Sequence, residues 1–390
     1  MKLMVVLSRV PYPLDKGDKL RAYHQLKHLG TQHEIYLFCV SDKEIGFDVR
    51  EHLLEFCKEV HIFRISKWQS YWTCFLCLFN MTPFQAKYFY SKVFHKQLLE
   101  AIKRIAPQNV FFQLIRTAEY AKQIKGVSTT LDYMDAFSAG YKRMAEKSSG
   151  LQAWFYRIEA KRLLRYEGEV FSLFTKHIII SEQDKKMIQH SKAQQIKVVP
   201  NGVDVEYFVP HNSTQKFDLI FHGNMNYFPN VHCALYVANE ILPQLNKQER
   251  NVSFLISGST PHPKIRALEN RKGIKVTGWL DDVRTTYSAA KIFIAPLQMG
   301  TGIQNKILEA MAMGIPCVVS ELAANALGLK HNEHVLIGHS VEEYCMHIES
   351  LFNNESLRKR LTEKALINVK KKFQWSDTTQ KLQQFLLADS

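Results

Sequence analysis

The stretch APLQMGTGIQNKILEAMAMGIPCVVS, residues 295–320, predicts a strand end, a glycine loop, an amphipathic helix and a second strand. Thr301 followed three residues later by Gln304 is a capping box, which predicts that the helix begins at Gly302. Gly314 should end the helix. Strands and helices that alternate in this way are typical of a parallel α/β sheet, whose ligands bind at the carboxyl ends of the strands.

The predicted helix also carries charges that suit an anion. At 100° per residue, Lys306 and Glu309 share one narrow arc beside an apolar stripe. A helix N-terminus offers unpaired N–H groups, the glycines allow close approach, and Lys306 adds a full positive charge. Glu309 would accept hydrogen bonds from sugar hydroxyls. The alternative is an exposed i,i+3 ion pair between the two, worth roughly 0.2 to 0.5 kcal/mol.

This segment resembles the nucleotide-sugar loop and helix of family 4 glycosyltransferases, which are retaining enzymes of GT-B fold. In that family the loop amides bind the donor diphosphate and the closing Glu, here Glu309, binds the ribose. The resemblance implies donor contacts from Thr301, Gly302, Ile303 and Lys306. One position departs from the family pattern, because the Glu that usually stands eight residues before the closing Glu is Thr301 here.

Two further resemblances are present, and the first of them extends from Ser8 to Trp375. The runs GIQNKILEAMAMG, LDYMD and PYPLDKGDKLRAYH resemble a subgroup of bacterial sugar transferases linked to exopolysaccharide and PEP-CTERM systems. The segment from Pro200 to Phe208 resembles the family's PNGVD-x-x-x-F connection between domains. The expected fold is therefore α/β, GT-B, with two Rossmann-like doubly wound parallel-sheet domains facing a cleft. We expect residues 1–210 and a crossing-back helix at 373–390 to form the acceptor domain, and residues 211–372 the donor domain.

Other donor contacts are expected where strands of the second domain end. The family often places an Arg and a Lys for the diphosphate after the first of these strands, where this chain has Asn224 and Asn230. In the resembled family, backbone groups beside the next strand ends bind the nucleobase. Because backbone contacts leave no side-chain signature of the base, UDP-linked and GDP-linked donors both remain alternatives. The candidates at these strand ends are Gly223, Asn224, Gly258, Trp279 and Leu280.

The first half contributes three candidates. Gly17 opens a helix after the first strand, and cations that include Arg21 crowd its first turn. In the resembled family this loop faces the interdomain cleft, so Gly17 and Arg21 are expected to contact an acceptor or donor phosphate. Asp132 follows a strand in LDYMD, where many family members have a His, and is the candidate for sugar binding or proton transfer. The alternatives are a solvated helix start and a helix cap.

Composition and charge limit the class of protein. The chain has 390 residues, 46% of them hydrophobic, which suits two globular domains. Residues 1–200 contain 31 Lys and Arg against 19 Asp and Glu, a balance of +12 out of the total of +14. This asymmetry favours an anionic partner. The sequence has no zinc-finger spacing and no RNA-binding motif, so nucleic acid is disfavoured as that partner. Its seven Cys lack the spacing of a disulfide framework, which favours reduced thiols and a cytoplasmic protein.

An aromatic segment suggests what that anionic partner is. Residues 68–86, WQSYWTCFLCLFNMTPFQA, contain no charge and six aromatic residues, but the run is too polar to span a bilayer. Basic residues flank it, which suits a segment lying in a membrane interface. We therefore expect an anionic membrane surface as a partner, and a cytoplasmic protein that is peripheral on the inner face of the membrane. The alternative is a helix buried against the sheet.

The sequence predicts a glycosyltransferase that moves a sugar from a nucleotide sugar to an acceptor hydroxyl with retention of configuration. The acceptor would be lipid-linked or an oligosaccharide of an exopolysaccharide or other cell-surface glycan. The absence of a DxD motif predicts no metal and no cofactor. One alternative is a GT-B-fold nucleotide-sugar epimerase that uses histidines such as His177 and His222. Another is a catalytically inactive, membrane-associated scaffold that binds a nucleotide sugar.

Overall fold

The computed structural model describes residues 1–77, 81–210, 214–247, 250–299 and 303–388, and the chain separates into two compact units. Unit 1 contains residues 1–200 and 378–390, and unit 2 contains residues 201–377. The division therefore falls ten residues before the expected boundary. Asn201 to Pro210 stay with unit 2 because Val203 is buried in its core and donates its N–H to the Phe373 carbonyl oxygen at 2.6 Å.

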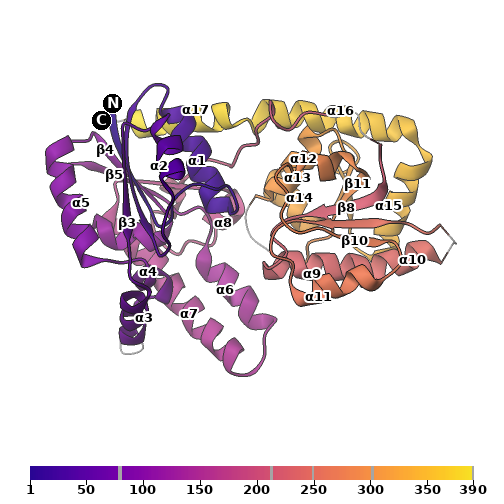
Figure 1. Ribbon diagram of the computed structural model, residues 1–390, viewed down its shortest axis with the longest axis horizontal. Helices are drawn as coiled ribbons and strands as arrows, with labels where there is room; N and C mark the ends of the chain where they lie inside the picture. Colours follow the sequence, from indigo (N-terminus) through magenta and orange to yellow (C-terminus); the bar gives the residue numbers. More distant parts are fainter. Residues whose placement is uncertain (78–80, 211–213, 248–249, 300–302, 389–390) are drawn as a thin grey trace. The chain divides into compact units, whose positions relative to one another are not determined.

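Unit 1 is built on a seven-stranded sheet in which every pairing is parallel (Figure 1). Its strands, in spatial order, are β3 (Glu59–Arg64), β2 (Glu34–Ser41), β1 (Lys2–Leu7), β4 (Asn109–Gln113), β5 (Ser128–Asp132), β6 (Lys176–Ile179) and β7 (Lys197–Val198). Its helices are α1 (Gly17–Leu29), α2 (Phe47–Leu54), α3 (Lys67–Leu76), α4 (Phe84–Tyr88), α5 (Lys92–Ile105), α6 (Phe137–Glu146), α7 (Gly150–Glu169) and α8 (Glu182–Lys185).

Both faces of this sheet are covered, as a parallel sheet requires. Along β1, Leu3, Val5 and Leu7 join a core with residues of α1, whereas Met4 and Val6 join a second core with residues of α5 and α7. This alternation follows from the two-residue period of a strand. The carboxyl ends of β1, β4 and β5 therefore form one rim that is lined by the loops leading to the following helical segments.

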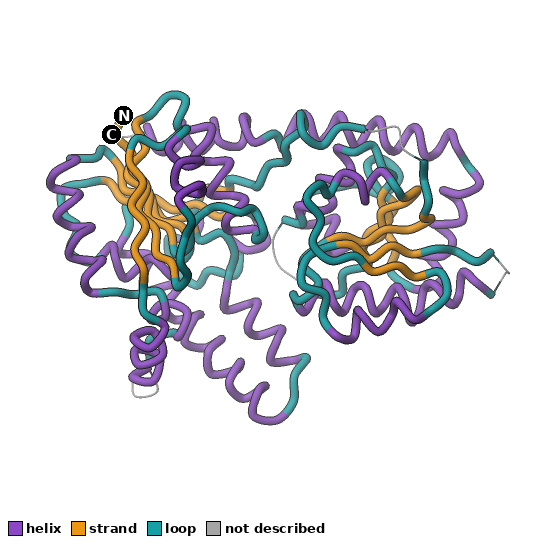
Figure 2. The backbone as a smooth tube through the Cα atoms, viewed as in Figure 1, coloured by secondary structure: helices purple, strands orange, loops and turns teal. Residues whose placement is uncertain are grey.

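Unit 2 repeats the plan with six parallel strands (Figure 2). In spatial order they are β10 (Ile274–Val276), β9 (Phe254–Ser257), β8 (Phe217–His222), β11 (Ala290–Ala295), β12 (Cys317–Ser320) and β13 (Leu336–Gly338). The helices are α9 (Phe228–Tyr236), α10 (Leu242–Asn246), α11 (Pro263–Arg266), α12 (Arg284–Ser288), α13 (Asn305–Ala312), α14 (Glu321–Leu327), α15 (Val341–Asn353) and α16 (Glu355–Lys372). Helix α17 (Trp375–Leu387) begins at the end of unit 2, and its residues from Thr378 onward belong to unit 1. Two parallel sheets with surrounding helices confirm the predicted GT-B architecture.

The C-terminal helix returns to unit 1, as predicted. Leu382 and Leu386 of α17 are buried in the same core as β1 and α1. Lys176 of β6 donates from Nζ to the carbonyl oxygens of Phe385 at 3.1 Å and Leu386 at 2.8 Å. Within the described ranges, no helix has the length and apolar character needed to cross a bilayer.

A close backbone contact fixes the ligand-facing edge of unit 2. Gly258, just after β9, has φ +135°, and a Cβ placed there would lie 1.8 Å from the carbonyl oxygen of Gly223. Only glycine fits, because the obstacle is backbone and an L side chain is strained at this φ. The ends of β8 and β9 are thereby held together, next to the start of α9.

Gly258→Ala is expected to destabilise unit 2 by about 2 to 4 kcal/mol, the sum of backbone strain and the steric clash. Gly278→Ala is the matched control, since a Cβ at Gly278 meets nothing within 4 Å. Thermal unfolding followed by circular dichroism measures both changes. Equal melting temperatures for the two variants would contradict the close approach.

Candidate functional site

The candidate donor site lies at the carboxyl edge of the unit 2 sheet, where Lys306 of α13 meets the loop after β8. The Lys306 Nζ donates to Asn230 Oδ1 at 2.7 Å and to Gln304 Oε1 at 3.1 Å. It also lies 5.4 Å from the centre of the Phe221 ring. Burial lowers the pKa of Lys306 to about 8. These amide partners are neutral and leave the positive charge of the ammonium group available to an anion.

Asn230 has a role that the sequence did not reveal. Its Nδ2 donates to the Asn224 carbonyl oxygen at 3.0 Å while its Oδ1 accepts from Lys306. A Cβ on Gly223 would meet this same Nδ2 at 2.7 Å. The amide thus orients the lysine from the first turn of α9. Asn224 itself caps its own turn, because its Oδ1 accepts the N–H of Asn226 at 2.9 Å.

Glu309 is held by a buried tyrosine. The hydroxyl of Tyr287, which is fully buried on α12, donates to Glu309 Oε2 at 2.8 Å. Burial raises the pKa of Glu309, although the Tyr287 hydrogen bond acts in the opposite direction. These contacts do not form the predicted alternative, an ion pair between Lys306 and Glu309. Lys306 donates to the amides of Asn230 and Gln304, whereas Glu309 accepts from Tyr287. Tyr287 is a positioning residue that sequence reasoning missed.

The start of α13 differs from its prediction. The helix begins at Asn305 rather than Gly302, and Gln304 precedes it with φ −92° and ψ 90° and without a capping hydrogen bond from its side chain. The Gln304 Oε1 accepts from Lys306, and Thr301, the other member of the predicted capping box, lies outside the described residues. Asn201 Nδ2 of the Pro-Asn-Gly segment donates to Asn305 Oδ1 at 3.1 Å and so contacts the first residue of the helix. Gly314 ends the helical segment as predicted, with φ +70°.

The other predicted donor residues are placed as follows. Ile303 is buried in the core of unit 2, so its side chain is directed away from solvent. Trp279 and Leu280 follow β10 and remain 58% and 37% exposed. Thr301 and Gly302 lie outside the described residues. Among the described residues, no group of three or more His, Cys, Asp or Glu side chains is placed to hold a metal ion.

In unit 1, Arg21 and Asp132 bind each other. The Arg21 Nε donates to Asp132 Oδ2 at 2.6 Å, and both side chains are fully buried. Asp132 Oδ1 accepts the N–H of Met134 at 2.9 Å. This corrects the expectation that the two side chains face a ligand, because burial directs them into the domain interior. Gly17, by contrast, begins α1 with open space around its Cα.

Three other residues occupy the rim of unit 1. Arg9 Nη1 donates to Asp18 at 2.7 Å, and Arg116, in the 3-10 segment after β4, has its Nη1 3.8 Å from the same carboxylate. Burial and repulsion from Arg9 lower the pKa of Arg116 to about 10. Burial and the charge of Asp184 raise the pKa of Asp135 to about 7. Asp135 follows β5 closely and is the rim carboxylate that Asp132 was expected to be.

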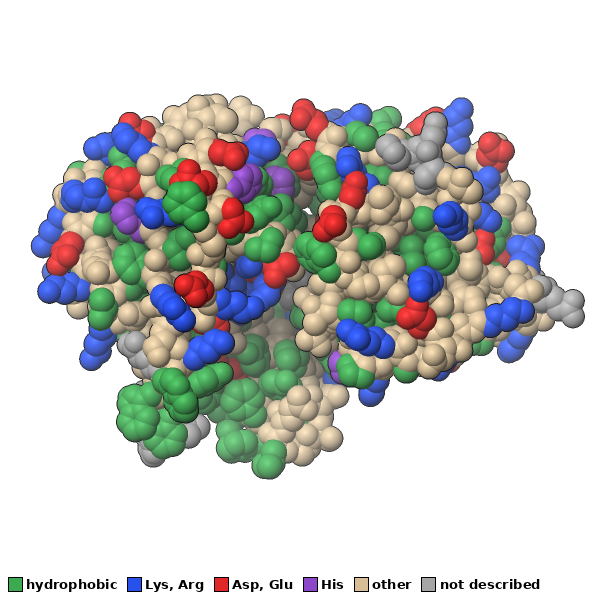
Figure 3. All heavy atoms as spheres, viewed as in Figure 1, with side chains coloured by type: hydrophobic (Ala, Val, Ile, Leu, Met, Phe, Trp, Pro, Cys, Tyr) green, Lys and Arg blue, Asp and Glu red, His purple; other side chains and the backbone are tan. Residues whose placement is uncertain are grey.

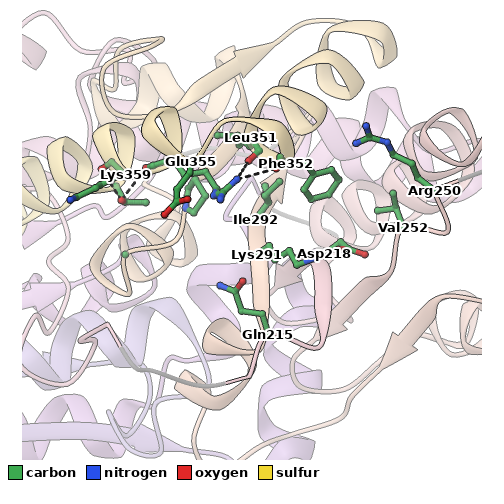
Figure 4. A pocket seen from close by; sticks show the side chains of 14 residues that line it. Gln215, Asp218, Arg250, Val252, Lys291, Ile292, Leu351, Phe352, Glu355 and Lys359 are labelled. Atoms are coloured by element: carbon green, nitrogen blue, oxygen red, sulfur yellow. Dashed lines mark hydrogen bonds and ion pairs between the residues drawn. The ribbon is translucent and has the colours of Figure 1, made fainter. Parts of the chain in front are cut away.

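A separate pocket of ≈ 640 Å³ lies at the opposite edge of the unit 2 sheet (Figure 4). Asp218 and Lys291, which are joined by a 2.9 Å ion pair, line it at the amino ends of β8 and β11. Arg358 on its wall donates to the carbonyl oxygens that end α15. Ligands of doubly wound sheets bind at the carboxyl ends of strands, so this pocket is distinct from the Lys306 site.

A family comparison agrees with the site in unit 2. Residues 216–354 match the model described as Glycosyl transferases group 1. This range contains Asn230, Tyr287, Lys306 and Glu309.

Two curated relatives are similar in sequence. An uncharacterised protein of the cps region of Klebsiella pneumoniae is 21% identical over 383 residues, covering 92% of this chain and 93% of the relative. The Escherichia coli enzyme UDP-Gal:alpha-D-GlcNAc-diphosphoundecaprenol alpha-1,3-galactosyltransferase is 23% identical over 224 residues, covering 51% of this chain and 54% of that enzyme.

Solved structures share the fold over the whole chain. Sucrose-phosphate synthase from Thermosynechococcus elongatus superposes with a TM-score of 0.71 at 13% identity and 98% coverage of each chain. Anabaena HepE in complex with UDP gives 0.67 at 13% identity and 99% coverage of each chain. The chain therefore has the GT-B fold, and residues 216–354 in its unit 2 match the glycosyltransferase group 1 model.

Proposed function

We propose that the protein transfers a sugar from a nucleotide sugar to an acceptor hydroxyl with retention of configuration. The observation that carries this proposal is Lys306, a partly desolvated cation held by neutral amides beside two glycines at the sheet edge. Glu309, one turn later and fixed by Tyr287, suits a donor hydroxyl. We propose a uridine donor, because HepE was solved with UDP and UDP-glucose and the Escherichia coli relative is named for UDP-Gal.

Lys306 would act on the leaving group. As the bond from sugar to phosphate breaks, the diphosphate gains negative charge, and a fixed cation stabilises that state more than the ground state. Lys306 supplies this charge without a metal ion. The resemblance to family 4 enzymes supports retention of the anomeric configuration. It also supports a mechanism in which the donor phosphate takes the proton from the acceptor hydroxyl.

We propose that the acceptor binds the rim of unit 1 and is a lipid-linked or oligosaccharide precursor of a cell-surface glycan such as an exopolysaccharide. Gly17 opens this rim, and Arg116 and Asp135 line it in place of the buried Arg21 and Asp132. Arg116 suits an acceptor phosphate, and Asp135 suits a sugar hydroxyl. The names of both curated relatives, one in a cps region and one acting on a diphosphoundecaprenol-linked sugar, support this acceptor class.

The epimerase alternative loses support from its histidines. Burial and the charge of Lys306 lower the pKa of His222 to about 3, and burial lowers the pKa of His177 to about 4. The His177 ring is stacked on Phe171 with centroids 3.7 Å apart. Both imidazoles are therefore neutral at pH 7 and poorly suited to exchange protons with a sugar.

Product analysis tests the proposal. The protein is incubated with UDP-glucose, UDP-galactose, UDP-N-acetylglucosamine or GDP-mannose, with oligosaccharide or polyprenyl-diphosphate-sugar acceptors, in the presence of EDTA. UDP release with a new glycoside that keeps the donor's anomeric configuration supports it. A donor converted only to its epimer identifies an epimerase, and donor binding without any product identifies a scaffold.

The lowered pKa of Lys306 predicts a pH-dependent affinity. A bound diphosphate favours the protonated amine, and the free amine loses its proton above pH 8. The Kd for UDP is therefore expected to rise about tenfold between pH 7 and pH 9. Calorimetric titration measures it. Lys306→Arg controls for ionisation of UDP itself, because guanidinium stays charged and its profile should be flat. Parallel profiles for both proteins would contradict the prediction.

A further inference from the structure

Helix α3 exposes its large apolar side chains, whereas an ordinary surface helix buries them. Its large side chains face solvent, with Trp68 85%, Trp72 63% and Tyr71 60% exposed. Small side chains face the protein instead, since Ser70 of α3 and Cys77, directly after the helix, are buried. An amphipathic helix normally buries its large apolar face. The predicted alternative of a helix buried against the sheet is therefore wrong for these aromatic side chains.

A second helix adds to the same exposed region. Leu151, Trp154 and Phe155, in the first turns of α7, are 85%, 60% and 39% exposed. Phe155 packs against Phe84 of α4 with ring centroids 5.4 Å apart, and Thr73 of α3 donates to the Lys87 carbonyl oxygen of α4. The large exposed apolar side chains form what we name the α3–α7 surface: Trp68, Tyr71, Trp72, Phe75, Leu76, Met81, Leu151, Trp154 and Phe155. Figure 3 shows hydrophobic side chains gathered in this part of unit 1.

The charges around this surface are basic. Residues 67–87 contain Lys67 and Lys87 but no Asp or Glu, and residues 147–158 contain Lys147 and Arg157 without an acidic residue. Along α7, Trp154, Arg157 and Lys161 follow at i, i+3 and i+7, which places them on one stripe. Lys161 therefore lies about 10 Å along the helix from Trp154. The apolar side chains at the start of α7 could therefore enter the acyl boundary of a bilayer while the cations one to two turns away lie at the level of the lipid headgroups.

We propose that the α3–α7 surface docks the protein on an anionic lipid bilayer. Trp and Tyr prefer the boundary between headgroups and acyl chains, and Lys and Arg attract anionic headgroups. The excess of +12 in residues 1–200 complements such a surface. A protein partner is less well matched, because stable protein interfaces are depleted in Lys at their centre and rely on complementary shape.

The placement on the fold links this surface to the acceptor rim. Helix α3 follows the carboxyl end of β3, and the α6–α7 hairpin follows the carboxyl end of β5 (Figure 1). The docking surface and the rim thus lie at the same edge of one sheet. A bilayer held there would present a lipid-linked acceptor to the rim. The docking itself does not depend on the proposed sugar transfer.

Vesicle co-sedimentation of the full chain, without donor, tests the docking. Wild-type protein is expected to bind phosphatidylcholine vesicles that contain about 30% phosphatidylglycerol, and to dissociate in about 0.5 M salt. Trp68→Ala/Trp72→Ala/Trp154→Ala and Arg157→Glu/Lys161→Glu should each weaken binding about tenfold or more. Thermal unfolding followed by circular dichroism should stay unchanged in both variants and so shows that they are folded.

Matched controls separate docking from general effects of charge or exposure. Lys370→Glu/Lys371→Glu, on exposed positions of α16, makes the same charge change, and Met346→Ser/Ile367→Ser removes exposed apolar side chains in unit 2. Both are expected to bind vesicles like the wild type. Absence of wild-type binding to anionic vesicles, or equal binding to neutral ones, overturns the proposal. A dimer that the tryptophan variant dissociates also overturns it, since the occupant is then a second copy.

Discussion

Replacing Lys306 with alanine is expected to lower kcat/KM for the nucleotide-sugar donor by about a hundredfold to a thousandfold, the loss typical of one preorganised charge-stabilising donor. The residue lies where a diphosphate would develop charge, and Asn230 and Gln304 already orient its ammonium group. Initial rates of UDP release at several donor concentrations measure the effect. Because the interaction strengthens in the transition state, kcat should fall as well as the affinity.

Two controls make this result specific to the site. Lys272→Ala removes the same charge from an exposed position of unit 2 and should leave the rate unchanged. The unfolding temperature of Lys306→Ala should not fall, since burial disfavours the charge that the substitution removes. A Lys306→Ala protein with wild-type kcat/KM would exclude Lys306 from the donor site.

Asp132→Ala is expected to destabilise unit 1 by about 3 to 5 kcal/mol, because it leaves the buried Arg21 guanidinium without its carboxylate. For a unit of this size the melting temperature should fall by roughly 10 °C. Differential scanning calorimetry measures the change. Arg21→Met/Asp132→Leu should recover most of the loss, since neither charge then remains buried. An inactive Asp132→Ala protein with wild-type stability would instead restore Asp132 as a catalytic residue.

The arrangement of strands could be predicted because each strand, glycine loop and helix is encoded locally. Gly17 begins α1 as expected, and Ser181 caps α8 by accepting the Asp184 N–H. The parallel order of both sheets then follows from the repeated strand and helix units. The position of Lys306 and Glu309 on one side of α13 was also available from helical periodicity.

Contacts between distant residues could not be predicted from local patterns. Arg21 and Asp132 are 111 positions apart, and nothing near either one indicates that the two side chains turn inward together. Asn230 was interpreted as a missing cation, whereas it holds Lys306 from 76 positions away. The capping-box motif predicted a helix start at Gly302, and it did not reveal that Gln304 accepts a hydrogen bond from Lys306. The outward face of α3 likewise depends on how α4 packs against it.

Calorimetric titration of the wild-type protein with UDP and GDP tests the central claim, a nucleotide site at Lys306 in unit 2, most directly. We predict saturable binding of one UDP per chain, weaker binding of GDP, and loss of UDP binding in Lys306→Ala but not in Lys272→Ala. A ligand present at 100 times its Kd should also stabilise the protein by about 2.7 kcal/mol. UDP binding that Lys306→Ala leaves intact, or no nucleotide binding at all, would contradict the account.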